Sequence, residues 1–166
     1  MRDRTMRTIF IGGEWVKFRP KSTEGRAVTI TIKYVDGRKG AILASSGRLK
    51  GAEFTAASKE LFARDFTADP LLYVLVERGD DVTAIDVTAD DVRDIARQDI
   101  EVSSKAPNVS VAVLAYDTLS YGLARMWQAY VDGSGWRTAI FQDRAAAVDW
   151  LRTEVAERTG ITIALE

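Results

Sequence analysis

The sequence VSVAVLAY (residues 109–116) is followed at once by DTLSYGLARMWQAY (117–130), and WRTAIF (136–141) is followed by DRAAAVDWLRTEVAERTG (143–160). The first segment of each pair is a short apolar run typical of a buried strand, and the second has the period of an amphipathic helix. Gly160 stands where the C-terminal cap of the last helix is expected. This succession of strand, helix, strand and helix predicts an α/β fold.

The residues before this stretch extend the same pattern. VTITIKYV (28–35) alternates apolar and polar residues, and AILASSG (41–47) returns after a turn, which predicts an antiparallel hairpin. A first helix is expected over 51–64, and its buried face is predicted to comprise Phe54, Ala57, Ser58 and Leu61. LLYVLVE (71–77) is typical of a central strand that is covered on both faces.

A second helix is expected after VTAIDV (82–87), with Thr88 at its N-cap. Its buried stripe is predicted to comprise Val92, Ile95, Ala96 and Ile100. The predicted buried face of the third helix comprises Leu119, Gly122, Leu123, Met126, Trp127 and Tyr130. Gly122 is costly inside a helix, so we expect it to allow a close approach of the helix backbone to the sheet.

These elements predict one α/β domain with a mixed, mainly parallel sheet, four helices and an N-terminal β-hairpin extension. Residues 1–27 form the extension, with two short strands about Gly12-Gly13, and residues 28–160 form the α/β domain. Residues 161–166 (ITIALE) are either a short edge strand or a frayed tail. The alternating strand and the hairpin offer an edge through which a homodimer could form.

Composition excludes several classes of protein. The 166 residues are 46% hydrophobic and 28% charged, which is ordinary for a globular protein. There is no Cys and no His, so thiolate and imidazole chemistry is absent. No segment has the length of a signal core or of a membrane span, so we expect a cytoplasmic protein without a membrane span.

Net charge is distributed unevenly along the chain. Residues 1–60 contain 13 Lys and Arg against 6 Asp and Glu, whereas residues 61–166 contain 10 against 18. The basic residues are scattered and are not clustered with aromatic residues, so we expect no nucleic-acid partner. The basic part is expected to face the acidic remainder of the fold or a second copy of the chain.

The order of elements over residues 28–155 resembles the STAS fold of anti-sigma factor antagonists, the SpoIIAA-like group. In that family a loop of the form hydrophobic-Ile-Asp-Ser-Ser-Gly precedes a helix, and a partner kinase phosphorylates its second Ser. The corresponding stretch here is AIDVTA (84–89), where Asp86 matches, Thr88 occupies the phospho-acceptor position, and Val87 and Ala89 depart from the pattern.

Four further segments are similar to a subgroup of uncharacterised bacterial STAS-like proteins. They are GRLKGAEFTAASKELF, DVTADDVRDIA, YDTLSYGLARMWQAY and WRTAIFQDRAAAVDWL. Relatives of this subgroup include lipid-binding domains of the CRAL-TRIO type. The resemblance implies a fold and a binding role, and it implies no reaction.

The loop before the second helix is the first candidate site. Thr88 is a candidate phospho-acceptor because phosphate at a helix N-terminus meets free backbone N–H groups. The alternative is that Thr88 serves only as an N-cap. Asp86, Asp90 and Asp91 are candidate partner-binding residues. The spacing of acidic residues does not fit a calcium loop, so no metal and no cofactor are expected.

The start of the third helix is the second candidate site, because ligands of open α/β sheets bind at the carboxyl ends of strands. Its candidate ligand-binding residues are Asp117, Ser120, Tyr121 and Arg125. The alternative is that Asp117 is an N-cap and Arg125 faces solvent. Nearby aromatic residues line either an apolar ligand pocket or the core: Trp127, Trp136, Trp150, Tyr130 and Phe141.

The sequence and the resemblance together lead us to expect a non-enzymatic STAS-like regulatory module. It would bind an unidentified protein partner through the loop of residues 86–91, with phosphorylation of Thr88 as one means of control. The alternative is a carrier of a small molecule or lipid, with a pocket among the third and fourth helices. A carboxylate-based enzyme is third, and two carboxylates with opposed pKa values in one cleft would indicate it.

Overall fold

The computed structural model describes residues 7–11, 14–18 and 29–166. Strands β1 (Arg7–Ile11) and β2 (Glu14–Phe18) pair antiparallel as a separate two-stranded sheet. They flank the Gly-Gly turn expected from the sequence, and that turn lies outside the described residues, as does the connector over 19–28.

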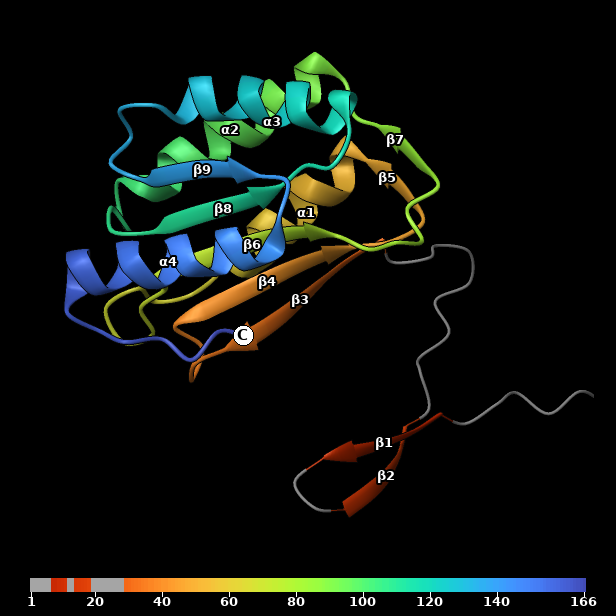
Figure 1. The fold of residues 1–166 in the computed structure, drawn as a ribbon, viewed down its shortest axis with the longest axis vertical. Coiled ribbons are helices and arrows are strands. Elements are labelled where there is room, and N and C mark those ends of the chain that lie inside the picture. The colour runs from red at the N-terminus through yellow and green to blue at the C-terminus, as the bar shows by residue number, and fades with distance from the viewer. Residues whose placement is uncertain (1–6, 12–13, 19–28) are drawn as a thin grey trace, which may run out of the picture.

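The main sheet has five strands and is covered by four helices (Figure 1). In spatial order its strands are β3 (Ile30–Val35), β4 (Gly40–Ser45), β6 (Tyr73–Arg78), β8 (Ser110–Leu114) and β9 (Arg137–Phe141). Strand β3 is antiparallel to β4, and every other neighbouring pair is parallel. The helices are α1 (Gly51–Leu61), α2 (Ala89–Ser103), α3 (Thr118–Val131) and α4 (Arg144–Thr159). The chain is therefore an α/β fold with a mostly parallel mixed sheet.

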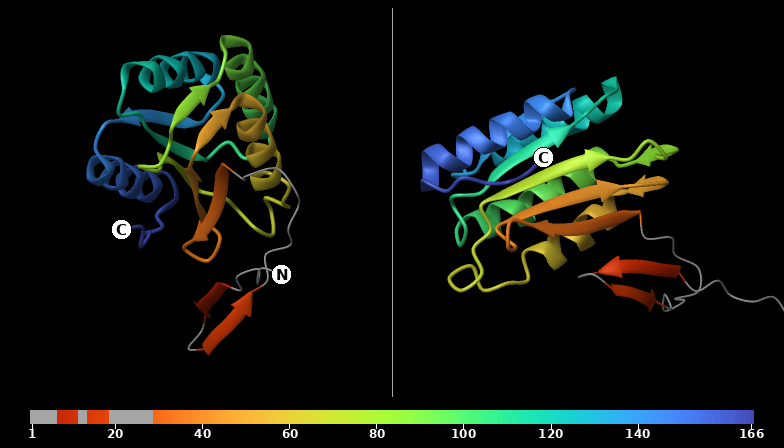
Figure 2. Two further views of the ribbon diagram at one scale, coloured as in Figure 1. Left: turned by 90° about the vertical axis from the view of Figure 1, so that its right-hand side faces the viewer. Right: turned by 60° about the horizontal axis from the view of Figure 1, so that its bottom comes forward.

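Strand order decides which face each helix covers. From β4 to β9 the chain always steps to the next strand in the same direction. Because such crossovers are right-handed, the three connecting helices must lie on the same face of the sheet. Helices α1, α2 and α3 cover that face, and α4 covers the other, as the end-on view in Figure 2 shows.

Each central strand contributes to both faces because successive side chains alternate. In β6, Val74 points to the face under α1, α2 and α3, while Tyr73 and Leu75 point to the face under α4. Strand β8 alternates in the same way with Val111 and Ala112. The apolar run predicted over 71–77 therefore is a central strand buried on both faces, as expected.

A small parallel sheet that the sequence did not predict joins the starts of two helices. Strand β5 (Arg48–Lys50) leads directly into α1, and β7 (Ala84–Asp86) leads into α2. The two helix starts approach so closely that a Cβ at Gly51 would lie 2.1 Å from Cγ of Asp91. A side chain at position 51 would thus force these two helix starts apart.

Helix α1 ends at Leu61, three residues earlier than predicted. Of its predicted buried face, Ala57, Ser58 and Leu61 are buried and Phe54 is partly buried. The predicted stripe of α2 is wrong at one position, because Ile100 is 42% exposed. The buried residues of this helix are Val92, Ala96, Asp99 and Ser103. They recur at intervals of four, three and four residues, so the buried face includes a carboxyl group.

The predicted face of α3 is also wrong in part. Leu119, Gly122 and Tyr130 are exposed, whereas Ala124 and Val131 are buried. A Cβ added at Gly122 would meet no atom within 4 Å, so this glycine does not mark a close approach to the sheet. The predicted face is correct at Trp127, which packs against the core, but the most buried residues of the helix are Ala124 and Val131.

Residues 161–166 form no strand, yet they are docked on the face covered by α4. Ile163 and Leu165 are buried in the cluster beneath that helix. Arg152 donates a hydrogen bond of 2.5 Å to the carbonyl of Leu165, and the amide of Ala164 donates one of 3.0 Å to Asp36. The segment is therefore neither the edge strand nor the frayed tail that the sequence left open.

Candidate functional site

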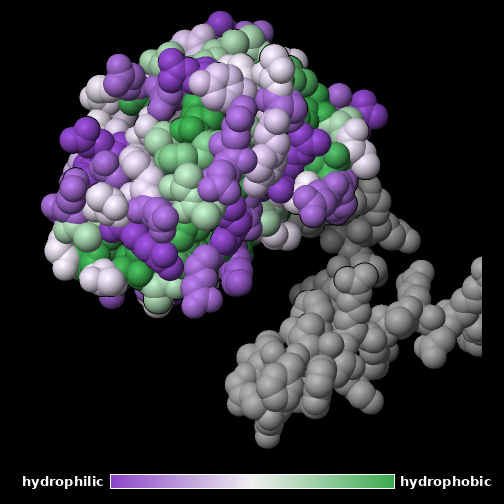
Figure 3. Space-filling model, in the orientation of Figure 1, coloured by the Kyte–Doolittle hydropathy of each residue, from purple (hydrophilic) through white to green (hydrophobic). Residues whose placement is uncertain are grey.

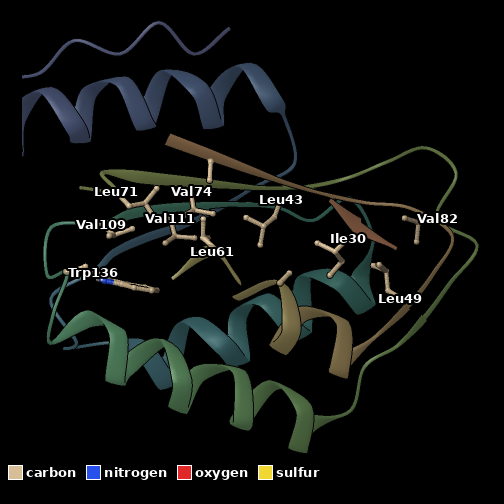
Figure 4. Packing of buried hydrophobic residues seen from close by; sticks show 13 residues of the cluster. Ile30, Leu43, Leu49, Leu61, Leu71, Val74, Val82, Val109, Val111 and Trp136 are labelled. Carbon is tan, nitrogen blue, oxygen red and sulfur yellow. Dashed lines mark hydrogen bonds between the residues drawn. The ribbon is translucent and has the colours of Figure 1, made fainter. Parts of the chain in front are cut away.

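An apolar cavity of about 180 Å³ lies between the sheet and helices α1, α2 and α3. Leu43, Val76 and Val113 form part of its floor on strands β4, β6 and β8. Figure 4 shows Leu43 and Val111 pointing from the sheet toward the helices in this region. From the helices the lining includes Phe54, Leu61, Ile95, Leu123, Ala124 and Trp127. Walls that are mainly apolar suit an apolar molecule.

The lining of the cavity extends along the strands. On β6 the lining residues run from Val74 to Arg78, four residue steps apart. At about 3.3 Å for each step, this corresponds to roughly 13 Å of length. Trp136 lies near one end, and Ser45, Arg78 and Ser120 lie near the carboxyl ends of the strands. Ligands of open α/β sheets usually bind at the carboxyl ends of the strands, which is the end with Ser45, Arg78 and Ser120.

Asp99 is the one carboxyl group of α2 that lines the cavity, and it is 5% exposed. Ser58 donates a hydrogen bond of 2.9 Å to its Oδ1, and the indole nitrogen of Trp127 donates one of 2.8 Å to Oδ2. Burial raises the pKa of Asp99 to about 6, and these two hydrogen bonds oppose the shift because they favour the charged form. Above this pKa the carboxyl group places a negative charge in the cavity wall.

Arg78 and Asp117 meet at the end of the cavity near the carboxyl ends of β6 and β8. Arg78 donates a hydrogen bond of 2.5 Å to Oδ2 of Asp117, and it donates another of 3.2 Å to the carbonyl of Val82. Asp117 caps α3 by accepting from the amide of Ser120 at 2.9 Å and from its hydroxyl at 2.6 Å. These bonds from Ser120, with the charge of Arg78 as a smaller contribution, lower the pKa of Asp117.

Two of the four residues predicted for this second site lie away from the cavity. Ser120 lines it and Asp117 lies beside it, but Tyr121 is 42% exposed and does not line it. Arg125 is exposed and donates a hydrogen bond of 2.6 Å to Gln128 on its own helix. Arg125 faces solvent, which was the alternative interpretation of this residue.

The residues of the first predicted site lie at the start of α2. Thr88 is the N-cap: its hydroxyl accepts from the amide of Asp91 at 3.2 Å, and Asp91 accepts from the amide of Thr88 at 2.8 Å. This reciprocal pairing lowers the pKa of Asp91, mainly through the backbone hydrogen bond. Asp86 forms an ion pair with Arg48, and Asp90 forms one with Arg93. The N-cap role of Thr88 is thus observed, and its exposed hydroxyl stays a predicted phospho-acceptor.

The aromatic residues that the sequence grouped together are divided between three places. Trp127 and Trp136 line the cavity. Phe141 and Trp150 pack against the opposite face, with ring centroids 5.7 Å apart. Tyr130 is exposed. The prediction of a pocket among the third and fourth helices is therefore wrong, because the sheet separates α3 from α4.

Sequence reasoning missed Asp99, which is the most unusual residue of the cavity. The signal was present, because Asp99 follows Val92 by seven residues and Ala96 by three, and thus belongs on the same helix face. Asp99 was assigned neither to the predicted buried stripe of this helix nor to a candidate site. The burial of its carboxyl group became apparent only from its contacts with Ser58 on α1 and Trp127 on α3.

Neither a metal site nor a membrane-spanning helix is found in the described part of the chain. No group of three or more Asp or Glu residues is arranged there to hold a metal ion. None of the described helices has the length and apolar character needed to cross a membrane.

The chain was compared with known proteins in three ways. No family model matches it, and no curated protein or solved structure matches it either.

Proposed function

We propose that this protein is a binding module for a small apolar ligand, held in the cavity between the sheet and helices α1, α2 and α3. The observation that carries the proposal is a space of about 180 Å³ with almost entirely apolar walls. A dry engineered cavity of about 150 Å³ is known to bind benzene. The space here is therefore sufficient for a monocyclic aromatic ring or a short acyl chain.

The placement of the cavity supports the same proposal. A void in a core loses the contacts that its lining atoms would otherwise make, so an unused space of this size reduces stability. A ligand restores these contacts. The end of the cavity near Arg78 and Ser120 lies at the carboxyl ends of the strands, where ligands of open α/β sheets bind.

Toluene is a suitable first probe because it is apolar, neutral and of the right size. Calorimetric titration of the wild-type chain is expected to show saturable binding. Ala124→Leu places a larger side chain in the cavity wall and should abolish the binding. Ala129→Leu, on the exposed side of the same helix, is the matched control and should bind as the wild type does. Equal binding by all three chains, or by none, would refute the proposal.

A role in binding a protein partner is the second candidate. The observation that favours it is a group of exposed apolar side chains next to the Arg78 end of the cavity: Tyr116, Leu119 and Tyr121. On the face shown in Figure 3, hydrophobic and hydrophilic residues are interspersed. Within this role, the STAS-like resemblance and regulation at Thr88 stay predictions. A partner protein that binds the wild type and Ala129→Leu, but not Leu119→Asp or Thr88→Glu, would support this role.

Opposed pKa shifts at Asp99 and Asp117 resemble those of an acid–base pair. We favour binding over catalysis for a geometric reason. The oxygens of Asp117 already accept hydrogen bonds from Ser120 and Arg78, and Asp117 does not line the cavity. It has no evident access to a molecule that sits beside Asp99.

A further inference from the structure

Asp99 places a carboxyl group in a mainly apolar wall, and no cation of the described residues forms an ion pair with it. None of the ion pairs in the described part of the chain includes Asp99. Its two observed donors, Ser58 and Trp127, are both neutral. Buried carboxylates in proteins are normally paired with a cation or a metal, because an isolated buried charge is costly.

The carboxylate also has acceptor capacity left. Its two oxygens offer about four lone-pair sites in total. The described side chains occupy one site on each oxygen. Asp99 is therefore able to accept further hydrogen bonds from a molecule in the cavity that it lines.

We propose that the ligand is a small apolar amine, with its protonated nitrogen hydrogen-bonded to Asp99 and its apolar body against Leu43, Val76 and Val113. This inference rests on the proposed ligand-binding function and specifies the chemical class of the ligand. A protonated amine supplies the positive charge and the donors that the carboxylate lacks. Such a charge-assisted pair is among the stronger hydrogen bonds, and the apolar surroundings strengthen it further.

The other charged groups that line the cavity do not remove this preference. From α1 the group facing Asp99 is the Ser58 hydroxyl, and from α3 it is the Trp127 indole. From the sheet, Glu77 and Arg78 line the same cavity. Arg144 binds Glu77 at 3.0 Å, and Arg78 is bound to Asp117, so each of these charges already has its partner.

Four probes of nearly equal size test the proposal: toluene, benzyl alcohol, benzylamine and benzoate. All have one aromatic ring. Toluene has no polar group, whereas the other three would present a hydroxyl, an ammonium or a carboxylate group to Asp99. Benzylamine is expected to bind roughly 10- to 100-fold more tightly than toluene, as a hydrogen bond between charged groups would provide. Benzoate is expected to bind more weakly than toluene, because its charge would repel that of Asp99.

Asp99→Asn is the decisive variant because it removes the charge and keeps nearly the same shape. It should remove the advantage of benzylamine over toluene, so that the two probes bind with similar affinity. Ser58→Ala is the matched control: it removes one hydrogen bond to the carboxylate and keeps the charge, so the preference for benzylamine should persist.

The pH dependence of the wild-type chain gives a second test that requires no variant. Protonation of Asp99 removes its charge, and this occurs around its pKa of about 6. An aliphatic amine stays protonated throughout this range. The affinity for benzylamine should therefore fall as the pH is lowered from 7.5 to 5, while the affinity for toluene should not fall.

The outcomes separate this inference from the function on which it rests. Binding of toluene with no advantage for benzylamine, or an equal advantage in Asp99→Asn, would overturn the amine assignment and leave the cavity as a binding site. Tighter binding of benzoate than of benzylamine would also overturn it. If none of the four probes binds, the proposed function itself fails.

Discussion

The indole nitrogen of Trp127 on α3 donates a hydrogen bond of 2.8 Å to the buried carboxyl group of Asp99 on α2. This contact joins two helices over the apolar cavity, and the Ser58 hydroxyl joins α1 to the same carboxyl group at 2.9 Å. One acidic residue thus links the three helices that form the roof of the cavity. The cost of burying it is the basis of the first prediction.

Asp99→Asn is expected to stabilise the protein at neutral pH. A carboxyl group whose pKa rises from 3.8 to about 6 on folding reduces the free energy of unfolding at pH 7.5 by up to roughly 3 kcal/mol. Asparagine keeps both contacts, because its oxygen can accept from Trp127 and its amide can donate to the Ser58 hydroxyl. Urea unfolding of both chains at pH 7.5 measures the difference.

The sign of the pH dependence provides the check on this first prediction. Between pH 3.8 and 6 the folded chain binds the proton more tightly than the unfolded chain, so stability falls as pH rises. The advantage of Asp99→Asn should therefore shrink as the pH is lowered from 7.5 to 4.5. Asp94→Asn, on the exposed face of α2, is the control and should change stability by less than about 0.5 kcal/mol at pH 7.5. A strongly destabilised Asp99→Asn chain would contradict the account.

Asp117→Asn is expected to have the opposite sign. Hydrogen bonds from Ser120 and the charge of Arg78 lower the pKa of Asp117, so its ionised form stabilises the folded chain. This contribution is present above the unfolded pKa of about 3.8 and is lost as the pH falls through the lower folded value. The group is 40% exposed, so the loss in Asp117→Asn at pH 7.5 should be no more than about 1 kcal/mol. Thermal unfolding of both chains at pH 7.5 and at pH 3 measures the loss of stability in Asp117→Asn. An equal loss at the two pH values would contradict the prediction.

Thr88→Ala should destabilise the protein by about 1 kcal/mol, because it removes the N-cap of α2. Thr88→Ser keeps the hydroxyl that accepts from the Asp91 amide and should stay within about 0.5 kcal/mol of the wild type. Thr162→Ala is a control at an exposed position in the C-terminal segment. Equal stability of Thr88→Ala and the wild type in urea would show that the cap is dispensable.

Ala124→Leu tests whether the cavity has room for a larger side chain. A leucine forced into a filled core usually costs about 1–3 kcal/mol. Here the added atoms enter the cavity, so we expect stability to be unchanged within about 1 kcal/mol or to rise. Ala147→Leu makes the same change in the filled core under α4 and should show the full cost. If both variants lose equal stability, the space beneath α3 is not available to a ligand.

Much of this fold could be predicted from sequence because the apolar periods are strong. The strands at 109–116 and 136–141 and the helices that follow them lie within two residues of the predicted bounds. Asp117, Asp143 and Gly160 cap these helices, each with a short-range hydrogen bond that depends only on neighbouring residues. Local signals therefore identified these elements and their ends.

What could not be predicted depends on contacts between distant segments. The three-residue strand β5 forms only because β7, more than thirty residues away, pairs with it. The faces of α2 and α3 were misassigned in part, because Ile100 and Leu119 are exposed. Asp99 is buried between α2 and its neighbours, where an apolar residue would be expected. Helical period alone does not show which polar residue the neighbouring helices enclose, and so the cavity and its carboxyl group were missed.

The most direct test of the central claim is a methyl NMR titration of the protein with toluene. If toluene binds in the cavity, the methyl resonances of Leu43, Val76 and Val113, which line it, should show saturable shifts. The methyl resonances of Leu151 and Val155, on the other face of the sheet, should stay in place. An absence of shifts at saturating toluene, or shifts confined to the face under α4, would contradict the claim that the cavity is a ligand site.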